Sequence, residues 1–383
     1  MKLKKAAIWF FILICCAVTF VFVFPNTGLN DLGLFAPDMD KIVSNQDYDG
    51  SNYKTLTVKE KYIYGMICEN HKEHKTDFRM SEEVTADEMT NVFTAVKFDF
   101  PDRGCLEDTY SFMQKGNYFY YSVKYWLSYE DCCERSEKCT EEAQRIALLA
   151  KDKSDYDKAL FFHDFLTQRT IYSESLENEV FTAYGAFFDG KANCSGFTAA
   201  MSMLLDFGGV ENGIILGEAK DKRDGQENVL HVWNVVTTDK GSGHVDVAWD
   251  ASDETNDLVN NHTYFYLSDE EISKDHVIFD KYKGLCPSSG GSYFHVNGTY
   301  FESWSENEQR KTGSLLADAV NSGETVEIKF KNESDYTSAA NYLFNKNGAY
   351  DLMYMFCDNR EKIPSELTYY VNDNQYTILI KLS

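Results

Sequence analysis

Proline and basic residues are both scarce in this chain of 383 residues. It has 5 prolines and 23 glycines, a content that excludes collagen-like and other low-complexity compositions. Hydrophobic residues make up 43% of the chain and aromatic residues 15%, so a mainly disordered chain is excluded as well. At about 150 residues per domain, the length predicts two or three folded domains.

The shortage of positive charge excludes one large class of function. Lysine and arginine together number 37, against 61 aspartates and glutamates, which gives a formal net charge of -24. Affinity for nucleic acids comes chiefly from basic side chains that neutralise phosphates, so we expect no nucleic-acid partner. The excess of carboxylates predicts a solvated acidic surface instead.

Charged residues are absent from the run between Ala6 and Phe24. As a helix rising about 1.5 Å per residue, this run can cross the hydrocarbon core of a bilayer. Three lysines precede it, and the positive-inside rule then keeps the amino terminus in the cytoplasm. Residues 1–28 are therefore expected to be a cytoplasmic tip and a signal anchor, with the body of a single-pass membrane protein outside the cell. A cleaved signal peptide and a lipid anchor at Cys16 are the alternatives.

Eight of the ten cysteines follow this apolar run, in a part of the chain where an oxidising compartment would preserve disulfides. Cys132, Cys133 and Cys139 crowd a short acidic segment without a nearby histidine, so a local disulfide is expected there rather than a metal site. Residues 68–74 place one cysteine and two histidines at helical spacing, but they offer no fourth ligand for zinc.

The first part of the body is expected to be rich in strands. Residues 29–55 are polar throughout and indicate a linker. Residues 56–139 are expected to form an N-terminal unit, with a helix at 57–69 and strands at 91–100 and 117–128, where aromatic and β-branched residues alternate with polar ones.

A central unit is expected over residues 140–290. Its apolar residues first recur at helical spacing in three segments, 140–150, 156–170 and 195–207. Strand-like runs follow at 212–219, 230–237 and 244–250. Helices followed by an antiparallel sheet indicate an α+β fold.

Residues 291–383 are expected to form a small α/β C-terminal unit that positions substrate or binds the cell envelope. Its expected elements are a helix near 313–320, a strand at 325–331, a helix near 336–344 and a closing strand at 375–382.

Three residues of the central unit suggest nucleophilic catalysis. Cys194 stands at the expected start of a helix, where the positive end of the helix dipole favours a thiolate. His231 and Asp246 lie on successive strands joined by a turn near 239–241, which brings them level or diagonal. A Cys-His-Asp relay follows from this spacing, with Asp250, on the same expected strand face, as the competing carboxylate.

The surroundings of these residues carry a family resemblance. Residues 190–197 (GKANCSGF), 230–234 (LHVWN) and 244–250 (HVDVAWD) resemble, in order and spacing, the three signature blocks of the transglutaminase-like superfamily. The likeness extends over 158–276 and is greatest to secreted or membrane-anchored bacterial members.

This resemblance implies a papain-like α+β core and a cysteine enzyme that acts on amide bonds. Cys194 matches the nucleophile, His231 the base and Asp246 the third member of the triad. The thiol would attack an amide carbonyl of a peptide, a protein or cell-wall material and pass the acyl group to an amine or to water. The backbone N–H of Cys194 and the hydroxyl of Tyr184 are the candidate oxyanion donors.

Other residues in the matching blocks are expected to have structural roles. Trp233 is expected to pack beside the site, and His163 and His276 to cap or bridge elements. Asn193 and Ser195 depart from the commoner family pattern and leave the substrate preference open. The chain has no EF-hand loop, so neither a metal nor another cofactor is predicted.

Two rival functions stay open at this stage. The same triad could serve a cysteine peptidase or amidase that uses water as the acceptor. The fold could also serve a non-catalytic binding module at the cell surface.

Overall fold

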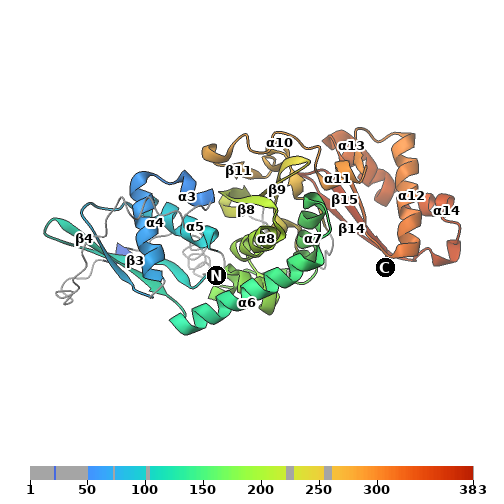
Figure 1. Ribbon diagram of the computed structural model, residues 1–383. Coiled ribbons are helices and arrows are strands. Elements are labelled where there is room, and N and C mark those ends of the chain that lie inside the picture. The colour runs from blue at the N-terminus through green and yellow to red at the C-terminus, as the bar shows by residue number, and fades with distance from the viewer. Residues whose placement is uncertain are drawn as a thin grey trace, which may run out of the picture.

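The computed structural model describes six segments of the chain, at residues 21–22, 51–71, 74–100, 104–220, 228–253 and 261–382. Figure 1 shows three parts in a row, with the blue N-terminal part and the orange C-terminal part on opposite sides of the green and yellow central part. Each part has its own cluster of buried apolar side chains, so the described segments fold around three cores.

The expected membrane segment lies outside the described residues except at Val21–Phe22, which form strand β1. In the part of the chain that the structure describes, no helix is both long and apolar enough to span a bilayer. The expected linker is described only from residue 51, where the short helix α3 (Ser51–Thr55) begins.

Helices cover a sheet in the N-terminal unit. The sheet has the strand order β1-β3-β4-β2, with β2 at Asp77–Met80, β3 at Leu106–Lys115 and β4 at Tyr118–Tyr125. The helices are α3, α4 (Val58–His71) and α5 (Ala86–Asp99). The predicted helix at 57–69 and strand at 117–128 are confirmed by α4 and β4, but the unit as a whole mixes helices and strands and is not β-rich.

The strand predicted at 91–100 is wrong, because these residues continue helix α5. Thr85 begins that helix with a capping box, in which its hydroxyl accepts the Glu88 N–H while the Glu88 carboxylate accepts the Thr85 N–H. Apolar residues then recur at helical spacing and are buried on one face. The second half of the helix contains the aromatic and β-branched residues that favour a strand. The residue that caps the helix, Thr85, lies outside the segment 91–100 on which the strand prediction is based.

The expected local disulfide among Cys132, Cys133 and Cys139 is also wrong. All three lie on one continuous helix, α6 (Tyr129–Leu149), in which seven residues rise about 10 Å, beyond the reach of a disulfide. Cys132 is instead bonded to Cys105, with their Cα atoms 6.0 Å apart. Because α6 runs unbroken across residues 139 and 140, the bond joins the first turn of this long helix to the N-terminal unit.

Helices pack on an antiparallel sheet in the central unit, as predicted. The helices are α6, α7 (Asp155–Thr167) and α8 (Cys194–Gly208). The sheet has the order β10-β9-β8-β7-β11. Its strands are Glu211–Lys220 (β7), Asn228–Thr238 (β8), Gly241–Val245 (β9), Phe265–Leu267 (β10) and His276–Ile278 (β11).

One strand of this sheet is shorter than predicted. The strand expected at 244–250 ends at Val245, and Asp246 caps a short helix, α9 (Val247–Asp250). The side chain of Asp246 accepts the Trp249 N–H at 3.1 Å and so begins the helix. Asp246 and Asp250 therefore do not share a strand face.

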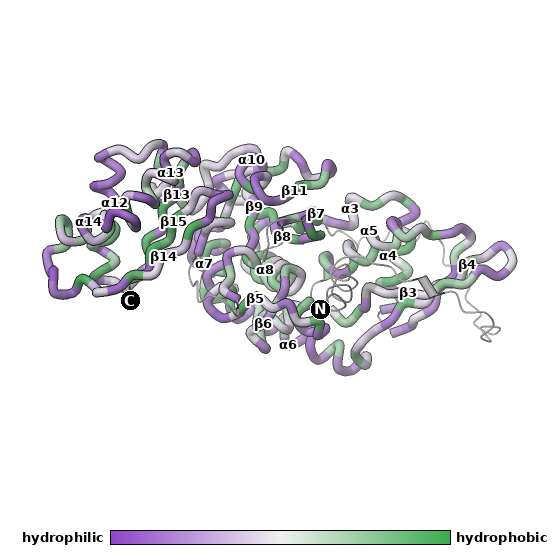
Figure 2. The backbone as a smooth tube through the Cα atoms, turned by 180° about the vertical axis from the view of Figure 1, so that it is seen from behind, coloured by the Kyte–Doolittle hydropathy of each residue, from purple (hydrophilic) through white to green (hydrophobic). Residues whose placement is uncertain are grey.

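The C-terminal unit combines a four-stranded sheet with three main helices. The sheet has the order β12-β13-β15-β14, with strands at Tyr300–Phe301, Val326–Phe330, Thr377–Leu382 and Leu367–Asn372. The helices are α12 (Glu306–Ser322), α13 (Glu333–Ala340) and α14 (Gly348–Phe356). Figure 2 shows β15 as a hydrophobic stretch, and all of β13 is buried beside it. The predicted strands at 325–331 and 375–382 are thus confirmed.

Candidate active site

Cys194 is the first residue of helix α8, as the sequence predicts. Asn193 caps the helix, since its Oδ1 accepts the N–H groups of Ser195 at 3.0 Å and Gly196 at 3.2 Å. The Cys194 N–H makes no hydrogen bond with any residue of the described segments. The helix start therefore presents a buried thiol beside a backbone donor that is available to a ligand.

Gly196 lets the start of α8 pack closely against the chain that precedes it. A Cβ atom at this position would lie 2.5 Å from the carbonyl oxygen of Val180 and 2.9 Å from Cβ of Ala192. The backbone cannot yield at these distances without moving the helix, so the absence of a side chain here fixes the position of Cys194.

His231 and Asp246 form a buried pair at the core of the site. His231 lies in β8, and Asp246 directly follows the neighbouring strand β9. The Nε2 atom of His231 is 2.6 Å from Oδ2 of Asp246, and the two residues are only 5% and 1% exposed. This hairpin contact is the one that the sequence predicts.

The surroundings of this pair favour its charged form. Burial acts to lower the pKa of His231, but the charge and hydrogen bond of Asp246, helped by the Cys194 side chain, raise that pKa to about 9. Burial acts to raise the pKa of Asp246, but His231 and His276 hold it well below its usual range. An imidazolium beside a carboxylate is therefore the stable state at neutral pH.

The Cys194 side chain lies close enough to the His231 ring to help raise its pKa, and helix α8, which begins at Cys194, packs on strand β8, where the Thr198 hydroxyl donates to the Val232 carbonyl at 3.1 Å. Because Nε2 is held by Asp246, Nδ1 is the ring nitrogen left to the sulfur. Sulfur, imidazole and carboxylate thus meet in one place, although they are far apart in the sequence.

Two tryptophans shield this trio. The ring of Trp233 stacks beside His231 at a centroid distance of 5.8 Å, and Trp249 meets His231 edge-on at 6.3 Å. Trp233 is fixed because its Nε1 donates to Nδ1 of His244 at 2.9 Å. A Cβ at Gly217 would lie 2.5 Å from the Trp233 ring, so the glycine leaves the space that this ring occupies. Trp233 packs beside the site, as expected.

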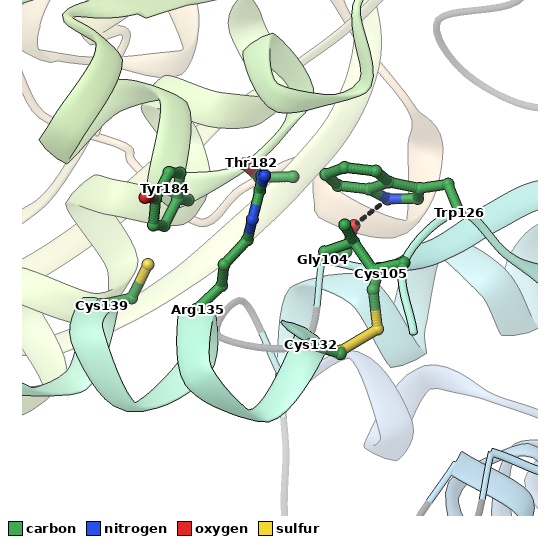
Figure 3. Close-up of a pocket in the computed structure, with 9 residues that line it drawn as sticks. Gly104, Cys105, Trp126, Cys132, Arg135, Cys139, Thr182 and Tyr184 are labelled. Atoms are coloured by element: carbon green, nitrogen blue, oxygen red, sulfur yellow. Dashed lines mark hydrogen bonds between the residues drawn. A yellow bond between two sulfur atoms is a disulfide. The ribbon is translucent and has the colours of Figure 1, made fainter. Parts of the chain in front are cut away.

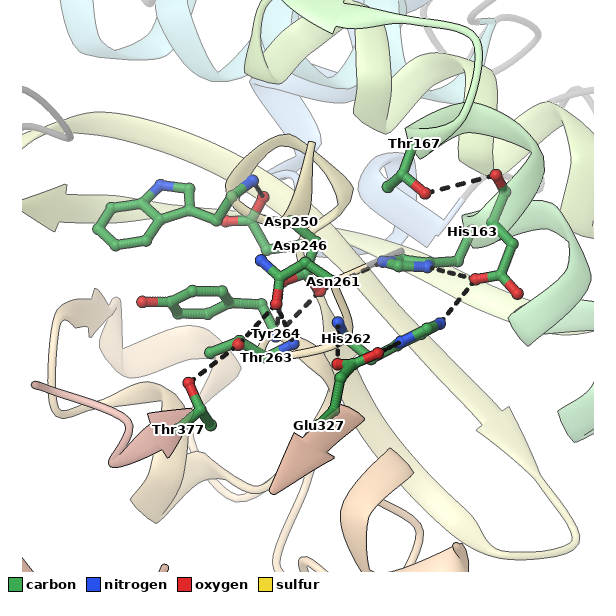
Figure 4. A network of polar contacts seen from close by, with 12 residues as sticks. His163, Thr167, Asp246, Asp250, Asn261, His262, Thr263, Tyr264, Glu327 and Thr377 are labelled. Carbon is green, nitrogen blue, oxygen red and sulfur yellow. Dashed lines mark hydrogen bonds and ion pairs between the residues drawn. The ribbon is translucent and has the colours of Figure 1, made fainter. Parts of the chain in front are cut away.

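Asp250, the competing carboxylate, belongs to a different network. Its Oδ2 lies 3.2 Å from Nε2 of His163, and its carboxylate also accepts the Tyr264 N–H at 2.9 Å. Figure 4 shows the His163 ring reaching from α7 toward Asp250. The structure therefore separates the two carboxylates, with Asp246 on His231 and Asp250 on His163.

Tyr184 lies in a different setting from the one expected of an oxyanion donor. Its ring packs under the guanidinium of Arg135 at 4.6 Å and against Phe188 at 4.8 Å. Figure 3 shows Tyr184 lining a pocket together with Arg135 and the Cys105–Cys132 disulfide. Within the described segments it makes no hydrogen bond with Cys194, so its role in catalysis stays a prediction.

The structure adds one residue that the sequence did not assign to the site. His276 of β11 lies 3.1 Å from Oδ2 of Asp246, the same oxygen that contacts His231. The sequence placed His276 in a matching block but gave no sign of this shared oxygen, because it depends on β8, β11 and the residue that follows β9 coming together.

Clusters of potential metal ligands also occur in the described segments. His231, Asp246 and His276 form one such cluster, and His163, Asp164 and His262 form another. In both clusters the members are already joined to one another by hydrogen bonds.

Residues 142–248 match the family model of the transglutaminase-like superfamily. No curated protein matches the chain. Among solved structures, a crystal structure of a TGase is 15% identical, with a TM-score of 0.26, and the match covers 48% of this chain and 52% of that one.

Two further structures show a similar degree of likeness. A proposed cysteine protease from Cytophaga hutchinsonii is 14% identical, with a TM-score of 0.25 and a match over 37% of this chain and 53% of that one. A proposed protease from Parabacteroides distasonis is 11% identical, with a TM-score of 0.20 and a match over 35% and 32%. The chain thus spans about half or less of each of these structures.

Proposed function

Because residues 142–248 form a domain of the transglutaminase-like superfamily, we propose that this protein is a cysteine enzyme that breaks amide bonds through a thioester. Cys194 is the nucleophile, His231 the acid and base, and Asp246 the group that orients and charges the imidazole. The observation that carries the proposal is the 2.6 Å contact between His231 and Asp246, with the Cys194 side chain near enough to help raise the pKa of His231.

The first half-reaction forms the thioester. In the reactive state the thiol proton is already on His231, and the Cys194 sulfur attacks the amide carbonyl carbon as the thiolate of this ion pair. The negative charge that develops on the carbonyl oxygen is stabilised by the N–H of Cys194 at the start of α8. The C–N bond then breaks, and the leaving amine receives the proton from Nδ1 of His231.

The second half-reaction releases the acyl group. Nδ1 of His231 takes a proton from an incoming amine or water, which attacks the thioester carbon. The C–S bond breaks and the sulfur leaves as the thiolate, paired again with the imidazolium. An amine acceptor gives a new amide, as in a transglutaminase, whereas water gives a carboxylic acid, as in a peptidase or amidase.

The substrates of this proposal are peptides, proteins or cell-envelope material, and the body of the protein acts outside the cytoplasm. The uncharged run from Ala6 to Phe24 supports a membrane anchor. The disulfide between Cys105 and Cys132 supports an oxidising compartment. Protease added to intact cells should digest the body and spare a tag on Met1. Protection of the body would contradict this orientation.

Alkylation tests the activated thiol directly. Iodoacetamide at pH 7 should modify Cys194 faster than the partly exposed Cys133, which serves as a reference within the same molecule. The preference for Cys194 should disappear in the His231→Ala variant. Equal reactivity of Cys194 in the two proteins would contradict the enzyme and favour a non-catalytic binding module.

A second experiment identifies the acceptor. The full chain is incubated with a glutaminyl peptide and a labelled primary amine, and Cys194→Ser serves as the control. Incorporation of the label supports transamidation, whereas release of ammonia or a shortened peptide without incorporation supports hydrolysis. The absence of every product across a panel of envelope peptides would count against both.

A further inference from the structure

One oxygen of Asp246 serves two imidazoles. Oδ2 lies 2.6 Å from Nε2 of His231 and 3.1 Å from Nε2 of His276, and the centroids of the two rings are 5.4 Å apart. All three residues are buried. The charge on this carboxylate is therefore divided between the proposed catalytic histidine and a second one.

The contacts of His276 show its protonation state. Its Nε2 faces Asp246, and its Nδ1 lies 2.7 Å from Oδ1 of Asp275. A neutral imidazole has one N–H and one lone pair, so it would direct a lone pair at one of these carboxylates. The geometry is satisfied only when both ring nitrogens donate, which makes His276 an imidazolium. Burial acts to lower the pKa of His276, but the two carboxylates raise it above its usual value.

Asp275 is held in turn by the C-terminal unit. Its Oδ2 accepts the Tyr264 hydroxyl at 2.8 Å and Nε2 of Gln375 at 3.1 Å. Asn372 donates to the same Tyr264 hydroxyl at 2.9 Å. Asn372 ends β14, and Gln375, which is fully buried, lies in the turn before β15. A chain of hydrogen bonds therefore runs from the C-terminal unit to the carboxylate beside the proposed active site.

We propose that His276 is a positioning residue of the proposed enzyme, a charged second imidazolium that the turn at residues 372–375 and Asp275 hold on Asp246. This inference rests on the proposed function. By sharing Oδ2, His276 weakens the hold of Asp246 on the His231 proton. That proton can then be passed to the leaving amine and recovered from the acceptor near neutral pH.

The charged and titratable groups that surround His276 come from several elements and contribute to this balance. They are Asp246 at the start of α9, Asp275 beside His276 itself, His231 on β8, His244 on β9 and Tyr264 before β10. The carboxylates favour the charged form of His276, and the neighbouring histidines oppose it. Removing His276 or its partner Asp275 should therefore shift the pH at which His231 titrates.

The pH profile of Cys194 alkylation by iodoacetamide in the full chain tests this inference. Its upper inflection reports loss of the proton from His231 beside the thiolate. His276→Gln keeps a donor for Asp246 but removes the charge, and it should move this inflection up by about one pH unit. Asp275→Asn, which is isosteric and lets His276 become neutral, should move it in the same direction.

His262→Gln is the matched control. His262 is also a buried histidine between two carboxylates, but its partners are Glu327 and Asp164, and it makes no hydrogen bond with Asp246. This variant should leave the inflection unchanged. An unshifted profile in both His276→Gln and Asp275→Asn, with alkylation still dependent on His231, would reduce His276 to a structural residue. If alkylation of the wild type did not depend on His231, the proposed function itself would fail.

Discussion

Nδ1 of His262 in the central unit lies 2.7 Å from Oε1 of Glu327 in the C-terminal unit. Its Nε2 lies 2.9 Å from Oδ1 of Asp164, and Glu327 also accepts the His262 N–H at 3.0 Å. Nearby, the buried Lys329 pairs with Glu271 at 3.1 Å. Two ion pairs thus cross the junction between these units, and Figure 4 shows Glu327 projecting from its strand toward His262.

The His262 pair should make stability depend on pH. Burial acts to lower the pKa of His262, but Glu327 and Asp164 raise it to about 10. The imidazolium therefore contributes stability that is complete below the unfolded pKa of about 6.5 and is lost as the pH rises through about 10. The difference in unfolding free energy between wild type and His262→Gln, measured in urea, should shrink between pH 7 and pH 10. A constant difference would contradict the ion pair.

Removing the other partner should be costly at neutral pH. Glu327→Gln leaves a charged imidazole facing an amide in a buried site, and a loss of about 3 kcal/mol is expected from breaking such a pair. Urea unfolding at pH 7 measures this loss. Glu302→Gln, at an exposed ion pair with Lys331, is the control and should change stability by less than about 1 kcal/mol.

The disulfide between Cys105 and Cys132 should stabilise the chain without supporting catalysis. It closes a segment with a sequence separation of 27, for which the loss of chain entropy predicts about 3.5 kcal/mol. The double variant Cys105→Ser and Cys132→Ser should therefore unfold at lower temperature. Alkylation of Cys194 at pH 7 should stay at the wild-type rate, and a large fall in that rate would show that the bond also orders the site.

Gly196 offers a test of how tightly the nucleophile is placed. Gly196→Ala puts a methyl group 2.5 Å from the Val180 carbonyl oxygen, and overpacking of this kind costs about 1–3 kcal/mol. We expect a lower melting temperature and a slower alkylation of Cys194, because the methyl group displaces the start of α8, which carries the thiol. Ser195→Ala, one position earlier, is the control and should resemble the wild type.

Local patterns were enough to predict most of the central unit. The helical spacing that follows Cys194 and the alternation around His231 are properties of short segments, and a hairpin brings successive strands together whatever surrounds them. The contact between His231 and Asp246 could therefore be predicted from the sequence. The strand end at Val245 could not, because Asp246 caps a helix only where the sheet ends.

The remaining features depend on contacts between distant residues. Cys105 pairs with Cys132 because α6 begins beside β3, which no spacing of cysteines reveals. The link from Asp275 to Gln375 spans 100 positions, so the role of the C-terminal unit was expected only in general terms. Helix α5 is a different case, because its capping box at Thr85 was present in the sequence and outweighs the strand-like residues that follow.

Asp246, which caps α9, and Asp250, which is its last residue, should differ sharply when each is changed to asparagine. Asp246→Asn removes the charge that opposes the desolvation of His231, so the pKa of His231 should fall from about 9 toward or below its ordinary value. The imidazolium that protonates the leaving amine would then be lost at neutral pH, and turnover should fall by about 10⁴-fold, as in other triads that lose this carboxylate. Asp250→Asn lies on the same short helix but contacts His163, so it should reduce stability while keeping the alkaline limb of the pH–rate profile near pH 9. Ammonia or amine release from a glutaminyl peptide between pH 5 and pH 10 measures both variants. Equal losses of turnover with unchanged pH limbs would mean that Asp246 only supports the fold, and that His231 takes its charge from another group.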